Sequence, residues 1–221
     1  MRFEDRSDAG RRLAAHLSEL SELPSDELVV LGLPRGGVVV AYEVATALGA
    51  PLDVILVRKL GVPFQPELAM GAIGEDGAHV VDEAVAREVR VSASDLAAVE
   101  DRERDELARR VRRFRGDREP LSLVGRTALI VDDGIATGST ARAACQVARA
   151  RGAARVIVAT PLASPGAVAR LGRDADEVIA LERPECLRAI GEFYDDFSQT
   201  SDAEVLEILS LAKQRIRVIV R

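Results

Sequence analysis

The sequence predicts an α/β protein built on a doubly wound, mostly parallel sheet. Short apolar runs typical of buried strands alternate along the chain with longer stretches of helical periodicity. Such alternation favours a parallel sheet whose two faces are both covered by helices. The chain has 221 residues, of which 48% are hydrophobic, so one large domain can bury a substantial core. Because only 3% of the residues are aromatic, we expect that core to consist mostly of Val, Leu, Ile and Ala.

Capping residues mark where several of the expected helices begin. Ser7 is expected to cap a first helix that includes residues 13–20. Ser92 and Asp95 form a capping box for a long helix that runs to about Phe114. The other expected helices are 37–49, 82–90, 139–152, 164–172 and 202–213, and the expected strands are 26–32, 53–59, 126–133, 154–161 and 175–182.

Two segments do not fit this alternation. Residues 60–77 are expected to form a long loop with short strand-like pieces, and a loop of that length inside a compact domain suggests a mobile functional segment. Residues 215–221, RIRVIVR, alternate like a strand, and the pattern alone does not fix their place in the fold. The sequence contains no internal repeat, low-complexity tract or clear linker.

Charge and cysteine content exclude several classes of protein. The net charge is −6, from 36 acidic and 30 basic residues, so we expect no capture of nucleic acid, although a single site can still attract an anion. Cys145 and Cys186 lack metal-ligand spacing, and we expect both to be small buried side chains. The charged start MRFEDRSDAGRR is unlike a signal peptide, and no apolar run reaches the ~20 residues of a membrane span. We therefore expect a cytoplasmic protein with no membrane partner.

The stretch ALIVDDGIATGST, residues 128–140, carries the clearest chemical signal. An apolar strand ends at two carboxylates, Asp132 and Asp133, which suit sugar hydroxyls or a hydrated divalent metal ion. Residues 136–140 have the composition of a tight turn that opens onto a helix, where bare backbone N–H groups suit a phosphate. The acid pair alone could also be a helix-cap cluster. Together, the two halves of the stretch indicate a sugar phosphate.

Two further segments are expected at the same edge of the sheet, because ligands of doubly wound sheets bind beyond the carboxyl ends of the strands. In LPRGG, residues 33–37, the glycines permit a close approach of backbone to ligand, and Arg35 can meet a second phosphate. Arg58 and Lys59 end the expected strand 53–59, although such a pair at a strand end is often only surface. The combination suits a sugar that carries phosphate groups at two ends.

These segments resemble the type I phosphoribosyltransferases. VDDGIATGST is similar to the family's signature for binding phosphoribosyl diphosphate, and LPRGG resembles its pyrophosphate loop. GLPRGGVVVAYEVA, VRKLGVPFQPELAMGAIGE and FYDDFSQTSDAEV are similar to an uncharacterised bacterial branch of the family. The resemblance is specific for the sugar donor and much less specific for the acceptor. It implies a single domain over residues 1–221, with a small hood from residues 1–22 and 183–221.

The resemblance also implies a role for each part of the site. Asp132 and Asp133 would bind the ribose hydroxyls and share Mg2+ with the sugar and the pyrophosphate, while Arg58 and Lys59 would help to neutralise the leaving group. The loop 60–77 would be a lid, and the peptide bond between Pro34 and Arg35 is expected to be cis. The pyrophosphate would face Arg35, Gly36 and Gly37, and the 5-phosphate would lie on Gly134, Ala136, Thr137, Gly138, Ser139 and Thr140.

The acceptor is the least determined part of the reaction. In the family a variable hood holds it, and residues 191–202 contain three of the seven aromatic residues of this chain. Stacking of Tyr194 and Phe197 on a base is one interpretation, and packing of the terminal helix is the other. Relatives that use 6-oxopurines commonly carry an acid at the position of Ala136, so we expect adenine or a non-purine base.

Three functions fit these patterns. The favoured one is transfer of phosphoribosyl to a small heterocyclic, nucleobase-like acceptor with release of pyrophosphate. The alternatives are a regulatory protein that senses phosphoribosyl diphosphate or a nucleotide, and a hydrolase or phosphorylase of phosphorylated ribose. The resemblance also implies a homodimer, for which Leu107, Val111 and Phe114 give the long helix an apolar stripe.

Overall fold

A five-stranded parallel sheet forms the centre of the protein. The computed structural model describes residues 2–20 and 27–219. In the sheet, the strands lie in the order β2-β1-β6-β7-β8, and all neighbouring pairs are parallel. Every residue of β1 and β6 is buried, as expected for strands covered on both faces. The strands are β1 (Leu28–Gly32), β2 (Leu52–Val54), β6 (Thr127–Val131), β7 (Arg155–Leu162) and β8 (Glu177–Glu182).

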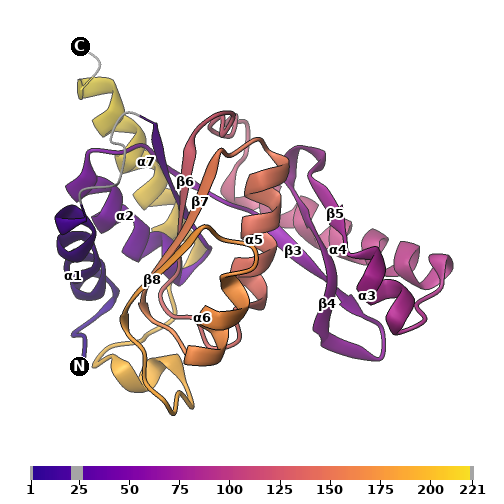
Figure 1. Cartoon of the computed structure of the whole chain (residues 1–221). Helices are drawn as coiled ribbons and strands as arrows, with labels where there is room; N and C mark the ends of the chain where they lie inside the picture. The colour runs from indigo at the N-terminus through magenta and orange to yellow at the C-terminus, as the bar shows by residue number, and fades with distance from the viewer. Residues whose placement is uncertain (1, 21–26, 220–221) are drawn as a thin grey trace.

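Helices cover both faces of this sheet, which confirms the doubly wound fold (Figure 1). The helices on one face are α1 (Arg6–Glu19), α2 (Gly36–Leu48) and α7 (Asp202–Ile219), and those on the other are α5 (Ser139–Ala150) and α6 (Pro165–Leu171). In the described ranges, none of the helices combines the length and the apolar character needed to span a bilayer.

A second, antiparallel sheet replaces the loop expected over residues 60–77. It pairs β3 (Val57–Val62), β4 (Gln65–Gly74) and β5 (His79–Val81), in the order β3-β4-β5. The glycines of this segment let two backbones approach closely: a Cβ on Gly71 would lie 2.3 Å from the carbonyl oxygen of Val80. The prediction of a long loop is therefore wrong.

The single strand expected over residues 53–59 is also wrong, because the segment divides between the two sheets. β2 belongs to the parallel sheet and β3 to the antiparallel one. Ile55 and Leu56 lie between them and are both buried. The run is apolar across the division, so its pattern gives no sign that the chain changes sheets.

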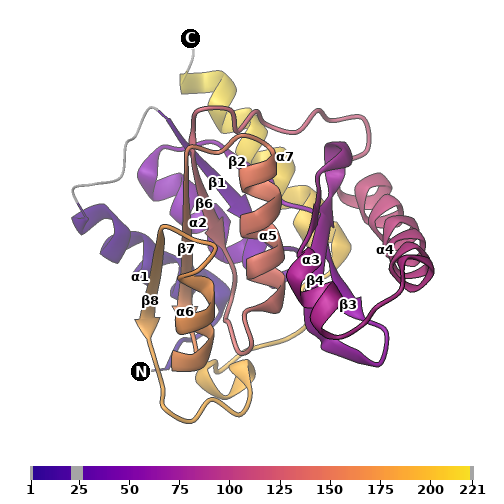
Figure 2. The ribbon, with the colours of Figure 1, turned by 45° about the vertical axis from the view of Figure 1, so that its right-hand side comes forward.

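The antiparallel sheet packs between α5 on one face and the long helix that follows β5 on the other (Figure 2). After β5 come α3 (Glu83–Glu88) and α4 (Ala93–Phe114). As predicted, the Ser92 hydroxyl caps α4, accepting a hydrogen bond from the Asp95 N–H at 3.1 Å. The apolar stripe of α4 packs against this sheet and α7. The stripe is thus largely covered by its own chain, because Leu107 and Phe114 are buried and Val111 is partly buried.

Three smaller expectations change. Asp5, rather than Ser7, caps α1, because its carboxylate accepts from the Asp8 N–H at 2.7 Å. Cys145 is buried as expected, but Cys186 is exposed. The tail 215–221 is helical as far as Ile219, and its last two residues lie outside the described residues, as do residues 1 and 21–22 of the expected hood.

Candidate functional site

Two adjacent carboxylates lie at the carboxyl end of β6, at the centre of the parallel sheet. Asp132 and Asp133 follow directly on Val131, the last residue of that strand. The Asp132 carboxylate accepts a hydrogen bond from the Asp133 N–H at 3.0 Å. Protein packed around the Asp132 carboxyl group shields it from water, and together with the neighbouring Asp133 charge this raises the pKa of Asp132 well above its usual range. A cation bound here would relieve that cost.

Arg6, which the sequence pattern did not point to, holds the second carboxylate. Its Nε donates to Oδ2 of Asp133 at 2.7 Å, and both side chains are largely buried. Its guanidinium group also donates to the carbonyl of Ser198 and lies 3.9 Å from the ring centre of Phe197. Arg6 is the first residue of α1, so the cap at Asp5, which sets the start of that helix, also sets the position of Arg6. Nothing in the local sequence connects it with a site that is more than 120 residues away.

Residues 33–37, called here the loop after β1 although Gly36 and Gly37 are the first residues of α2, pass very close to the acid pair. A Cβ on Gly36 would lie 2.0 Å from Oδ2 of Asp133, and one on Gly37 would lie 2.8 Å from the Val131 carbonyl and 3.0 Å from Oδ1 of Asp132. Both glycines are therefore required by close approach rather than by an unusual backbone angle. The peptide bond between Pro34 and Arg35 is cis, as predicted.

The Arg35 side chain is paired with a carboxylate outside the acid pair. Its Nη1 lies 3.4 Å from a carboxylate oxygen of Asp202, at the start of α7. A role for Arg35 on a pyrophosphate therefore requires this ion pair to open.

The turn before α5 presents a row of unpaired backbone donors. Gly138 adopts φ +80° immediately before the first residue of α5, a conformation that glycine accepts without strain. Among the described residues, none accepts a hydrogen bond from the N–H groups of residues 136–140. Two carbonyls on this turn, by contrast, accept hydrogen bonds. The Ser164 hydroxyl donates to the Ala136 carbonyl, and Arg170 donates to the Thr137 carbonyl. Fixed carbonyls and free N–H groups at a helix N-terminus make an anion cradle.

The rest of the cradle is shaped by its neighbours. Gly134 lies against Ile190, so that a Cβ there would come within 2.4 Å of that side chain. The hydroxyls of Thr137 and Ser139 lie 3.4 Å apart. A cavity of about 340 Å³ separates the start of α5 from the β3–β4 hairpin, with Thr137, Ser139 and Arg170 in its lining. Thr140, the second residue of α5, completes the segment that the sequence predicted for the 5-phosphate.

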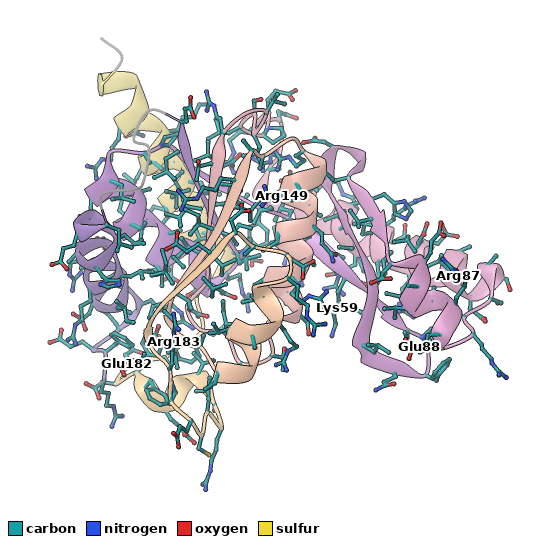
Figure 3. All side chains as sticks on the ribbon, in the orientation of Figure 1. Lys59, Arg87, Glu88, Arg149, Glu182 and Arg183 are labelled. Carbon is teal, nitrogen blue, oxygen red and sulfur yellow. The ribbon has the colours of Figure 1, made fainter. Side chains whose placement is uncertain are left out.

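Arg58 and Lys59 lie on opposite faces of β3, because side chains alternate along a strand. Arg58 faces α4, where it donates to Glu103 at 2.7 Å. Lys59 shares its face with Val57, which packs with α5. Figure 3 shows Lys59 projecting between the antiparallel sheet and α5. Of the two, only Lys59 is on the side of α5 and of the turn at residues 136–140, which is called the phosphate turn below.

The N-terminal segment and residues 190–198 meet beside the acid pair. Phe3 bridges to Tyr194 and accepts a hydrogen bond from the Asp195 N–H. Tyr194 is buried in contact with the rings of Phe3 and Phe197, and its hydroxyl donates to the Asp133 carbonyl at 2.6 Å. Its ring is thus used in packing here, whereas Phe197 lies at the edge of the site beneath Arg6.

Comparison with known proteins identifies the family. Residues 3–182 match the family model described as phosphoribosyl transferase domain. The chain is 56% identical over 210 residues to the Mycobacterium tuberculosis protein named "Putative phosphoribosyl transferase Rv0571c", a match that covers 95% of this chain and 47% of that protein. The chain thus spans about half the length of the curated relatives it matches.

Solved structures agree with this assignment. TT1426 from Thermus thermophilus superposes with a TM-score of 0.85 at 47% identity, covering 95% of this chain and 98% of that one. AQ2163 from Aquifex aeolicus, at 13% identity and a TM-score of 0.51 over 84% of this chain and 78% of its own, shares the fold alone. The family match spans the acid pair, the loop after β1 and the phosphate turn, and the chain belongs to the phosphoribosyl transferase domain family.

Proposed function

We propose that the protein transfers the 5-phosphoribosyl group of phosphoribosyl diphosphate to a nucleobase-like acceptor and releases pyrophosphate. One observation carries the proposal: the Asp132–Asp133 pair lies directly before a turn whose N–H groups have no acceptor in the described chain. Carboxylates suit the ribose hydroxyls, and the free N–H groups at the start of α5 suit the 5-phosphate. On the other side of the acid pair, the backbone of Gly36 and Gly37 lies directly against the Asp133 and Asp132 carboxylates, and we assign the pyrophosphate to this loop.

The acid pair fits a magnesium ion that is shared with a substrate. Among the described residues no group of three or more His, Cys, Asp or Glu side chains could hold a metal ion, so a complete site made by protein alone is not supported. Mg2+ is commonly bound by one or two carboxylates together with substrate phosphates. Asp132 and Asp133 would hold it, and it would neutralise charge on the departing pyrophosphate.

Catalysis would rest on positioning and charge neutralisation. The chain holds the ribose on the acid pair and the 5-phosphate on the turn, which fixes C1 of the ribose in the space between the loop after β1 and the acceptor side. Lys59, which projects between the antiparallel sheet and α5, would add positive charge near the phosphate turn. The β3–β4 hairpin would act as the lid, with Phe64 at its turn, where that side chain is 69% exposed.

The acceptor side is formed by Arg6, Phe197 and the turn around Ala136. Ala136 cannot exchange a proton with a base, whereas a positioned acid or base typically contributes ~10²–10⁴ in rate. Adenine or a non-purine base is therefore the expected acceptor. Turnover of hypoxanthine should be poor in the native protein and improved in Ala136→Asp, and efficient turnover by the native protein would show that Ala136 does not discriminate.

Pyrophosphate release tests the reaction itself. The native protein is incubated with phosphoribosyl diphosphate, Mg2+ and a panel of purine, pyrimidine and other heterocyclic bases. Release that depends on one base supports the transferase. Release without any base would indicate a hydrolase, and tight donor binding with no release under any condition would indicate a regulatory protein.

A homodimer is a further proposal, supported by the family resemblance alone, since the stripe on α4 is largely covered. Light scattering at micromolar concentration should report twice the 23.7 kDa of the chain. A monomer would contradict it.

A further inference from the structure

A second pocket lies on the other side of the loop after β1. This pocket, of about 810 Å³, is open to solvent and is lined by Pro34 and Arg35 of the loop, the C-terminal half of α4, and Asp202 at the start of α7. Four arginines of α4 line it, namely Arg109, Arg110, Arg112 and Arg113. With Arg35 they make an arginine pocket, and its volume lies within the range of small-molecule sites.

Positive charge exceeds negative charge in the arginine pocket. Its five guanidinium groups face two carboxylates, Glu106 and Asp202. Glu106 pairs with Arg109 at 2.7 Å and with Arg110 at 3.4 Å. A hydrogen bond from Arg110, with the charges of Arg109 and Arg110, lowers the pKa of Glu106. Even after this pairing, three positive charges are in excess.

The excess is concentrated on one face of α4. Arg109, Arg112 and Arg113 stand at i, i+3 and i+4, so their side chains are neighbours and repel one another. Within the described chain Arg112 has no ion pair, and Arg113 is paired only with Asp202, at 2.7 Å. The carbonyl end of the helix favours positive charge in its last turn, but that does not explain why the arginines meet Arg35 across a cavity. A bound anion would explain it.

The arginine pocket and the proposed phosphoribosyl site both border the loop after β1 but have different lining residues. The loop after β1 turns the backbones of Gly36 and Gly37 toward Asp133 and Asp132. The same loop contributes Pro34 and Arg35 to the arginine pocket, whose lining contains neither the acid pair nor any residue of the phosphate turn. The two sites are separate but adjacent.

We propose that the arginine pocket binds the di- or triphosphate group of a small molecule, and that this ligand lowers the affinity of the neighbouring site for phosphoribosyl diphosphate. Guanidinium groups pair with phosphate oxygens in bidentate fashion, and several of them converging on one cavity suit several linked phosphates. The concave shape and the overall charge of −6 favour a small ligand over a nucleic acid backbone. The second half of the proposal rests on the proposed function.

Asp202 supplies the coupling between the two sites. It pairs with Arg113 at 2.7 Å and with Arg35 at 3.4 Å. A phosphate group that takes over Arg113 leaves Asp202 to Arg35, which then stays in this ion pair and away from the pyrophosphate. Because coupling between two bound ligands is reciprocal, phosphoribosyl diphosphate should weaken the binding of the polyphosphate to the same degree.

Calorimetry with inorganic tripolyphosphate, ATP and GTP, without metal ions, tests the binding. The native protein should bind tripolyphosphate, and Arg109→Ala with Arg112→Ala should weaken that binding at least tenfold. The matched control is Arg87→Ala with Arg104→Ala, which removes the same charge from exposed helical positions outside the pocket and should leave the affinity unchanged. Circular dichroism checks that all variants are folded.

Comparing tripolyphosphate with ATP and GTP shows whether the pocket recognises phosphate groups alone or a whole nucleotide. Equal affinity for tripolyphosphate and the nucleotides would assign recognition to the phosphates alone, and tighter binding of one nucleotide would add its base. Both outcomes support the pocket. An equal loss in the control variant, no binding of any of the three, or tighter binding of a short RNA would overturn it.

The coupling is measured by titrating phosphoribosyl diphosphate at saturating tripolyphosphate, with Mg2+ in excess over both. The donor Kd should rise several-fold in the native protein, and the rise should disappear in Arg109→Ala with Arg112→Ala. A rise that persists in that variant would mean simple competition at one site and would overturn the proposal. If tripolyphosphate binds through the arginines while phosphoribosyl diphosphate does not bind at all, the proposed function fails and the arginine pocket stands.

Discussion

The parallel and antiparallel sheets of the protein are built in different ways. In the parallel sheet, β1 and β6 are buried at every residue, and the strands end at the candidate site. In the antiparallel sheet, β3 mixes buried positions with half-buried polar ones, and its pairing with β4 is irregular around Gly61. The parallel sheet thus forms the floor of the candidate site. The antiparallel sheet, called the arm below, packs on α5 and α4 beside this floor and carries the β3–β4 hairpin.

A buried ionic cluster joins the two sheets. Arg115, at the end of α4, donates to Asp53 of β2 and to Glu75, which follows β4. All three residues are about 5% exposed. The junction between floor and arm therefore combines paired charges with apolar packing, whereas the floor itself depends on apolar packing.

The largest effect is expected from breaking this junction. Arg115→Met would leave the buried Asp53 carboxylate without its cation and Glu75 with Arg151 alone, at 3.7 Å. Removing one partner of a buried ion pair typically costs ~3–5 kcal/mol. Chemical denaturation should show a fall of this size in the free energy of unfolding. As a control, Arg104→Met removes an exposed guanidinium from α4 and should change it by less than ~0.5 kcal/mol. Equal losses in both variants would show that the cluster does not join the sheets.

The sequence predicted the parallel sheet and the position of Asp132 and Asp133 at its edge, because continuous apolar runs that end in polar residues are local signals. It failed for the antiparallel sheet. There, Gly61 and Gly71 serve close contact between strands rather than turns, and no local pattern separates these two uses of glycine. Arg6 was missed for a related reason, since its partner Asp133 is distant in the chain and no periodicity links them.

A smaller loss of stability is expected where the loop after β1 packs against β6 of the parallel sheet. Gly37→Ala would place a Cβ 2.8 Å from the Val131 carbonyl, which is backbone and cannot move aside easily. Overpacking of this kind costs ~1–3 kcal/mol. Gly172→Ala is the matched control, because the nearest atom there lies at 3.7 Å. Thermal unfolding should separate the two variants, and identical midpoints would contradict the close approach.

The aromatic contact at the edge of the floor should contribute less. Tyr194→Phe removes the hydroxyl that donates to the Asp133 carbonyl at 2.6 Å but keeps the ring packed against Phe3. The loss of one such hydrogen bond costs ~1 kcal/mol. Urea denaturation measures it. A variant as stable as the native protein would mean that the hydroxyl does not hold the acid pair in place.

The smallest effect is expected at the turn of the antiparallel arm. Phe64 is 69% exposed, so Phe64→Ala should change the free energy of unfolding by less than ~0.5 kcal/mol. If the hairpin is the lid, the same variant should lower the rate of pyrophosphate release without lowering stability. A loss of more than ~1 kcal/mol in stability would show that the arm is packed more closely than this structure indicates.

Donor binding tests the central claim most directly. Calorimetry should detect binding of phosphoribosyl diphosphate in the presence of Mg2+, and chelation of the metal should abolish it. Asp132→Asn with Asp133→Asn should weaken binding at least tenfold while circular dichroism shows a folded protein, since the carboxylates are expected to hold both ribose and metal ion. Absence of binding by the native protein with Mg2+ present would contradict the assignment of the acid pair and the phosphate turn to this donor.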